Sequence, residues 1–305
     1  VTAKNSPYSE LTLQVIDKNA PGAALYEQPV QMYRAPVVMV HGLWGRSKSF
    51  EPMRTEFINS NLWPKDLTYL VEYYTRADRH FSDNWPVIKS NILWSIKRLV
   101  VLKKFSVGRT NVIAHSMGGI LTRLFIQSDD YNDQIARFIT LNTPHAGSQW
   151  GNFLLEHPCG LALTHFLDDY LNHYTRRGAI FDLRVNSSAI LTTLNGGDNL
   201  NKNTVPSHAV VTAAVIKDPT DHDSWLYQAV KKVNFYAALA TKFGETSVEL
   251  TQEFINATFN QEENDIIVPV SSQTGGSLQG ISFPAIWHVG AQSHSDIIQH
   301  FITLL

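Results

Sequence analysis

The sequence has a single cysteine, Cys159, among its 305 residues. An intramolecular disulfide is therefore excluded, and cysteine usage gives no information about the redox compartment. Since no activating context surrounds Cys159, we interpret it as a packing residue and not as a nucleophile. No apolar run approaches the roughly 20 residues that a membrane-spanning helix needs. The net charge of −2 provides no basic field, which argues against nucleic acid as a partner.

The composition is that of a globular protein, with 44% hydrophobic and 17% charged residues. We find no internal repeat and no low-complexity linker, so we expect one domain over residues 1–305. Buried strands are predicted to alternate with helices, which indicates an α/β fold with a doubly wound, mostly parallel sheet. The expected strands are 11–16 (at a sheet edge), 36–40, 67–74, 111–113, 138–141, 208–216 and 285–289, and the expected helices include 84–105 and 295–305.

The alternation is interrupted twice. Residues 149–206 contain no clear strand and are rich in bulky apolar side chains, which predicts a helical insertion. Residues 219–262 are predicted to be a second, irregular to helical insertion. We expect the first of these to be a cap or lid, since it has more apolar positions than a solvent-facing layer needs.

The most informative segment is Ala114-His115-Ser116-Met117-Gly118-Gly119. It lies between a β-branched run and a helical-looking run, which is the layout of a nucleophile elbow. Small residues at 114 and 118 are needed there because strand and helix backbones nearly touch beside Ser116. The first position is Ala and not the usual Gly. By itself the pattern also fits an ordinary strand-to-helix turn.

A serine nucleophile needs a histidine base, which in turn needs a carboxylate to orient it. The sequence offers Asp265 in a turn and His294 in a polar loop before the last helix, in the chain order expected of an α/β-hydrolase. The competing acids are Asp218, Asp221 and Asp223. The competing histidines are His288, which we assign to a strand, His300 in the terminal helix, and His115 beside the nucleophile.

Donors for a developing oxyanion are also present. The backbone N–H of Met117 follows the nucleophile, and the glycine-containing loop 41–45 can turn the N–H of Leu43 toward Ser116. Trp44, in the same loop, and His115 are the residues that we expect to contact substrate.

Together these motifs resemble the α/β-hydrolase lipases and esterases of bacterial type. The resemblance rests on segments 38–43, 114–119, 142–148 (Asn-Thr-Pro-His-Ala-Gly-Ser), 264–272 and 294–295. It implies an acyl-enzyme on Ser116, with His294 as base then acid, Asp265 as its orienter, Leu43 and Met117 as oxyanion donors, and a cap after residue 148. The implied activity is carboxylic ester hydrolysis. Thioesters, phospholipid acyl esters, amides and polyesters remain alternatives, as does a non-catalytic binding protein.

The expected partner is a small acyl ester or a lipid, including one at a lipid–water interface. No cofactor is expected to be required. Some lipases of this type bind calcium near the catalytic loops, and Asp296 is the position where such a ligand could lie. Related lipases can also carry zinc, but we interpret the Asp/His clusters at 78–83 and 218–223 as solvated loop charge. The resemblance and the non-Met start lead us to expect a secreted or periplasmic protein.

Overall fold

The computed structural model describes residues 6–19, 22, 24–156, 177–197, 204–214, 259, 262–275 and 280–305. Within these ranges a central sheet of six parallel strands has the order β4-β3-β5-β6-β7-β8. The expected α/β fold with a parallel sheet is confirmed. The strands are β3 Val37–Val40, β4 Thr68–Leu70, β5 Thr110–His115, β6 Ile135–Leu141, β7 Ser207–Ala213 and β8 Gly280–Pro284.

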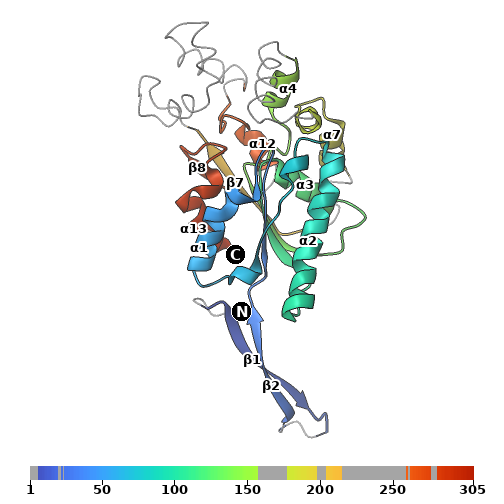
Figure 1. Ribbon diagram of the computed structural model, residues 1–305, viewed down its shortest axis with the longest axis vertical. Coiled ribbons are helices and arrows are strands. Elements are labelled where there is room, and N and C mark those ends of the chain that lie inside the picture. Colours follow the sequence, from blue (N-terminus) through green and yellow to red (C-terminus); the bar gives the residue numbers. More distant parts are fainter. Residues whose placement is uncertain are drawn as a thin grey trace.

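Helices cover both faces of this sheet (Figure 1). Along β3, Val38 and Val40 face one hydrophobic cluster, whereas Val37 and Met39 face the other. Both sides of the strand are buried, which explains its uninterrupted apolar run. Helices α2 Phe81–Lys103 and α3 Met117–Ile126 contribute to the first cluster, and α1 Glu51–Asn59 and α13 Ser295–Leu304 to the second. Short 3-10 turns lie at Ser47–Phe50, Lys65–Leu67, Tyr74–Arg76 and Ala291–Ser293.

The N-terminal strand does not join the central sheet as expected. Strand β1 Tyr8–Ile16 pairs antiparallel with β2 Ala24–Tyr33 in a separate two-stranded sheet. This hairpin projects from the body at the end opposite α4 and α7 (Figure 1). Alternation of apolar and polar residues identifies a strand but not its partner, so the predicted strand is correct and its predicted place is wrong.

The predicted position of the last strand is also wrong. Residues 285–289 were expected to form it, but β8 ends at Pro284 and the apolar run lies in the loop after it. Ala285 begins that loop with φ 61°, a left-handed conformation that ends the extended backbone. The consequence is that His288 lies beyond the carboxyl end of a parallel strand, where sites in this architecture form.

Part of the first predicted insertion is described. It contains α4 Gln149–Glu156, α6 Gly178–Asp182 and α7 Ala189–Asn195, while 157–176 and 198–203 lie outside the described residues. The second insertion, 219–262, lies outside them except for residues 259 and 262, as do Asp218, Asp221 and Asp223. Helix α12 Val270–Thr274 follows it. Among the described residues no helix is long and apolar enough to cross a bilayer.

Candidate active site

Ser116 lies on a sharp turn between β5 and α3. Its backbone has φ 55° and ψ −133°, a strained conformation for a residue with a side chain. Its N–H donates to Leu141 O on the neighbouring strand at 2.8 Å. A Cβ on Gly118 would lie 2.5 Å from His41 O, and one on Gly42 would lie 2.6 Å from Ser116 Cβ. Only glycine fits at these two positions, so the predicted elbow geometry is present.

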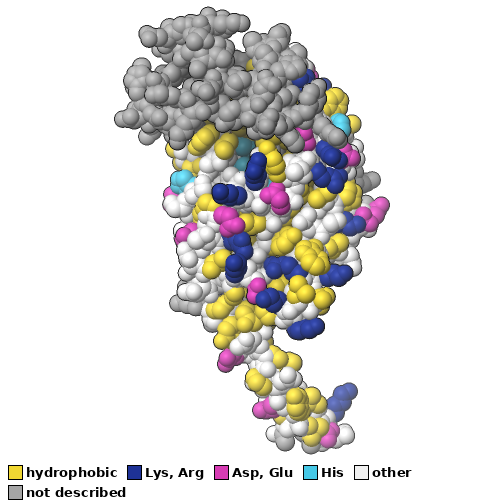
Figure 2. All heavy atoms as spheres, in the orientation of Figure 1, with side chains coloured by type: hydrophobic (Ala, Val, Ile, Leu, Met, Phe, Trp, Pro, Cys, Tyr) yellow, Lys and Arg dark blue, Asp and Glu magenta, His cyan; other side chains and the backbone are white. Residues whose placement is uncertain are grey.

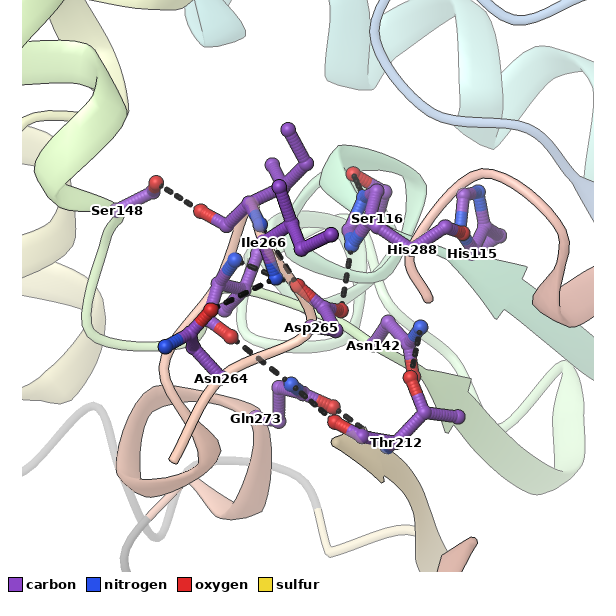
Figure 3. A network of polar contacts seen from close by, with 12 residues as sticks. His115, Ser116, Asn142, Ser148, Thr212, Asn264, Asp265, Ile266, Gln273 and His288 are labelled. Atoms are coloured by element: carbon purple, nitrogen blue, oxygen red, sulfur yellow. Dashed lines mark hydrogen bonds and ion pairs between the residues drawn. The ribbon is translucent and has the colours of Figure 1, made fainter. Parts of the chain in front are cut away.

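A continuous chain of hydrogen bonds joins Ser116 to a carboxylate through His288 (Figure 3). His288 Nε2 lies 2.8 Å from Ser116 Oγ, and His288 Nδ1 lies 2.7 Å from Asp265 Oδ2. A carboxylate oxygen accepts, so Nδ1 carries the imidazole proton and Nε2 has a lone pair for the serine hydroxyl. All three side chains are buried or nearly so, which strengthens both interactions.

This arrangement corrects the histidine that the sequence favoured. His294 was predicted to contact Ser116 and Asp265, but it is the N-cap of α13, with its carbonyl accepting from Ile298 N at 3.0 Å. Its Nδ1 is buried and has no hydrogen-bond partner among the described residues. The error follows from the misplaced strand: with β8 ending at Pro284, the first histidine of the following loop is His288.

Asp265 is fixed by a tight turn. Its Oδ1 accepts from Ile267 N at 3.0 Å and from Val268 N at 2.7 Å, while its side chain has no exposed surface. Ile266 has φ 81°, which is rare for a β-branched residue, and its N–H donates to Asn264 Oδ1 at 2.9 Å. With Oδ1 held by two amides, only Oδ2 is available to His288. The carboxylate can therefore present one defined oxygen to the imidazole.

The Asn-Thr-Pro-His-Ala-Gly-Ser segment supports that turn. Ser148 Oγ donates to Ile267 O, and Gly147 O accepts from Ser272 Oγ at 2.7 Å. Gln273 Nε2 donates to Val268 O at 3.0 Å and, on β7, to Thr212 O at 2.9 Å (Figure 3). The motif thus contacts the acid turn through Ser148 and α12 through Gly147, while Gln273 connects the turn to the sheet.

His115 makes a contact that the sequence did not indicate. It was predicted to meet substrate, but its ring is buried, with Nε2–H donating to His288 O at 2.9 Å. Desolvation, with a smaller contribution from neighbouring His288, holds the pKa of His115 well below its usual value. The ring centroids of the two histidines are 4.8 Å apart. A neutral His115 therefore supports the loop that carries His288.

The loop at 41–45, which follows β3, begins with His41, and Tyr73 holds this residue in place. Its ring stacks on Tyr73 with centroids 4.1 Å apart, and its carbonyl accepts from Tyr73 Oη at 2.5 Å. Burial lowers the pKa of His41 below its usual value. Leu43 and Trp44 follow, and Trp44 has φ 55°. Both pack against an apolar cluster formed by Leu154 and Ile180 with Trp150, Phe153 and Leu155.

The described residues contain no group of three or more His, Cys, Asp or Glu side chains that could hold a metal ion. Asp296 lies in the first turn of α13, where Ser295 Oγ donates to its Oδ1 at 3.4 Å. Calcium binding at Asp296 stays a prediction.

Comparison with known proteins gives a family match over part of the chain and a fold. Residues 35–177, which include the elbow and the loop at 41–45, match the family model described as "Putative serine esterase (DUF676)". The lipase BlEst2 of Bacillus licheniformis in its mature form is similar in structure, with a TM-score of 0.59 and 16% identity, over 89% of this chain and 91% of that chain. Its propeptide form has a TM-score of 0.58 and 15% identity over 89% and 51%.

Phospholipase PlaB of Legionella pneumophila has a TM-score of 0.51 and 15% identity over 79% of this chain and 46% of that chain. The chain thus spans about half the length of PlaB and of the propeptide form of BlEst2. At these identities the matched structures establish the fold. The chain has the α/β-hydrolase fold, and its segment 35–177 is similar to the putative serine esterase family.

Proposed function

We propose that this protein is a carboxylic ester hydrolase that works through an acyl-enzyme on Ser116. The observation that carries the proposal is the hydrogen-bonded series from Ser116 Oγ through His288 to Asp265. The family match to serine esterases supports the same activity independently of these distances.

The chemistry follows from the positions of the protons. His288 Nε2 accepts the hydroxyl proton as Ser116 Oγ attacks the ester carbonyl carbon, and Asp265 stabilises the imidazolium that forms. The same nitrogen then gives the proton to the leaving alkoxide, which departs as an alcohol. In the second step His288 takes a proton from water as the hydroxide attacks the acyl carbon, and then gives that proton to Ser116 Oγ, which releases the acid and restores the serine.

The tetrahedral intermediates need hydrogen-bond donors. We assign this task to the backbone N–H of Met117, the first residue of α3, and to that of Leu43. Gly42 lies against Ser116, which favours the following amide as a donor to the developing oxyanion. Since α3 begins at Met117, its positive dipole end also faces the developing charge.

The apolar cluster beside the elbow favours an acyl chain as the substrate group. Leu43 and Trp44 follow Gly42 directly and pack with α4 and α6 residues. Trp150 belongs to this cluster and also donates from Nε1 to Ile266 O, in the acid turn. Apolar surface of this kind binds hydrocarbon and not a charged group. We therefore assign Trp44 to the acyl site and residues 149–206 to a cap above it.

The test is hydrolysis of p-nitrophenyl esters by wild type and Ser116→Ala, with circular dichroism to verify folding. A fluorophosphonate probe should label wild type and not the variant. Undiminished turnover by Ser116→Ala would overturn the proposal, and failure of the folded wild type to react with the probe would favour a binding protein on this fold.

A panel of acyl esters, thioesters, phospholipids, amides and polyester film then identifies the bond and chain length. Preference for acyl chains of four carbons or fewer would contradict a lipase with a long acyl site. The proposal requires no cofactor, so activity should survive EDTA. Export from the cytoplasm, which the resemblance to bacterial lipases implies, completes the proposal.

A further inference from the structure

The β1–β2 hairpin has one apolar face that nothing in the described chain covers. Cross-strand pairs Leu11↔Val30, Leu13↔Gln28 and Val15↔Tyr26 alternate with Glu10↔Gln31, Thr12↔Pro29 and Gln14↔Glu27. Paired residues of an antiparallel ladder lie on the same face, and successive pairs lie on opposite faces. We define the apolar face by the side chains of Leu11, Leu13, Val15, Tyr26, Val30 and Met32.

Five of these six side chains are exposed and Val30 is half-buried, although the hairpin has a base to pack on. Tyr33 stacks on Phe105 at 5.1 Å, which holds the hairpin to the body, yet Leu13 is 59% and Tyr26 58% exposed. Figure 2 shows hydrophobic side chains along the projecting arm. An isolated two-stranded hairpin is marginally stable in water, and contiguous exposed apolar surface marks an interaction site.

We infer that the apolar face of the hairpin is the interface for a second copy of this chain. The two acidic side chains in the strands, Glu10 and Glu27, both lie on the opposite face. Two apolar faces can therefore pack together without burying a charge or meeting like charges. A two-fold axis brings the same patch of each copy into contact, as a closed dimer requires.

The area is sufficient for a weak dimer. Five of the six side chains are 37–59% exposed, so two hairpins packed face to face remove on the order of 1,000 Å² from water, the lower limit for a specific interface. The free energy gained by burying this area only slightly exceeds the entropic cost of association. We therefore expect a dissociation constant on the order of 10 µM.

The position of the hairpin disfavours a lipid surface as the occupant. The arm leaves the body at the end opposite the carboxyl ends of the strands, where Ser116 lies (Figure 1). A bilayer bound at the arm would hold the candidate active site away from it. The strands also carry carboxylates and no Lys or Arg, whereas anionic lipid attracts basic segments.

Sedimentation velocity of the full chain at about 1 to 200 µM tests the inference. Wild type should pass from monomer to dimer in this range. Leu13→Glu, at the middle of the apolar face, should stay monomeric, because it places two like charges in the interface. Thr12→Glu is the matched control, since it puts the same charge one residue away on the opposite face and should dimerise like wild type.

Thermal melts of both variants check that the body stays folded, and flotation with neutral phosphatidylcholine vesicles is run in parallel. A wild type that stays monomeric at 200 µM would overturn the inference. Equal loss of dimer in both variants would also contradict it. Flotation of a monomeric wild type that Leu13→Glu abolishes would assign the face to lipid. None of these results depends on hydrolytic activity.

Discussion

Asp265→Asn is the substitution whose effect follows most directly from the geometry. Asp265 Oδ1 accepts from the amides of Ile267 and Val268, and Oδ2 faces His288 Nδ1 at 2.7 Å. In the variant, the amide oxygen must stay with the two backbone donors, so the NH₂ group faces His288. A donor then faces a donor, and the imidazole moves its proton to Nε2.

The resulting tautomer cannot accept from Ser116. Nε2 lies 2.8 Å from Ser116 Oγ, and with a proton on that nitrogen the base is lost while the shape is kept. In serine-histidine-aspartate sites the wrong tautomer costs about 10⁴ in kcat, which is roughly 5.5 kcal/mol of transition-state stabilisation. The substitution keeps the two turn hydrogen bonds, so we expect the fold to persist.

Steady-state hydrolysis of p-nitrophenyl butyrate, with active-site titration by a fluorophosphonate, measures this loss. Asp296→Asn is the matched control, because its exposed carboxylate is on α13 and makes no contact with His288. It should retain wild-type turnover. Retention of more than about a tenth of the activity by a folded Asp265→Asn would refute the role given to the carboxylate.

Three further perturbations test the surroundings of the site. Gly118→Ala puts a Cβ 2.5 Å from His41 O, a backbone atom that cannot turn away, and should lower the unfolding free energy by about 1–3 kcal/mol in urea titrations. His115→Phe removes the donor to His288 O and should lower kcat about tenfold with little change in KM, whereas His115→Gln should restore part of it. Burial lowers the pKa of both His115 and His145, so the unfolded chain binds protons that the folded chain does not. The unfolding free energy should therefore fall as pH drops below about 6.5, by up to about 1.4 kcal/mol per pH unit for each histidine.

Control substitutions separate these specific effects from a general loss of stability. Gly22→Ala adds a Cβ with nothing within 4 Å and should leave the urea midpoint unchanged. A pH-independent unfolding free energy between 6.5 and 4.5 would contradict the burial of neutral histidines. A wild-type kcat in His115→Phe would show that its hydrogen bond does not position His288.

Much of the frame could be predicted from local pattern. The uninterrupted apolar run at 36–40 predicts a strand buried on both faces. In the structure hydrophobic clusters cover both faces of β3. The elbow was predictable because Ser116 needs small neighbours on either side. Asp265 was identified as a turn acid, and the structure brings its carboxylate to the elbow through His288.

The wrong predictions concern the residue at which the last strand ends. β8 at Gly280–Pro284 is mostly exposed and has weak apolar patterning, so the more apolar residues 285–289 were mistaken for it. That shift moved His288 into a strand and left His294 as the preferred base. Pro284 gave no signal against this prediction, because proline is tolerated at the first residue of a strand as well as on edge strands. No local sequence pattern indicates that the hairpin forms a separate sheet, since strand pairing is a long-range property.

The most direct test of the assignment compares His288→Ala with His294→Ala in the same preparation. Turnover of p-nitrophenyl butyrate and the rate of fluorophosphonate labelling are measured for both, with circular dichroism to verify folding. The account predicts that His288→Ala loses at least about 10³-fold in kcat and labels very slowly, while His294→Ala stays within about threefold of wild type. Loss of activity in His294→Ala, with His288→Ala still active, would contradict it.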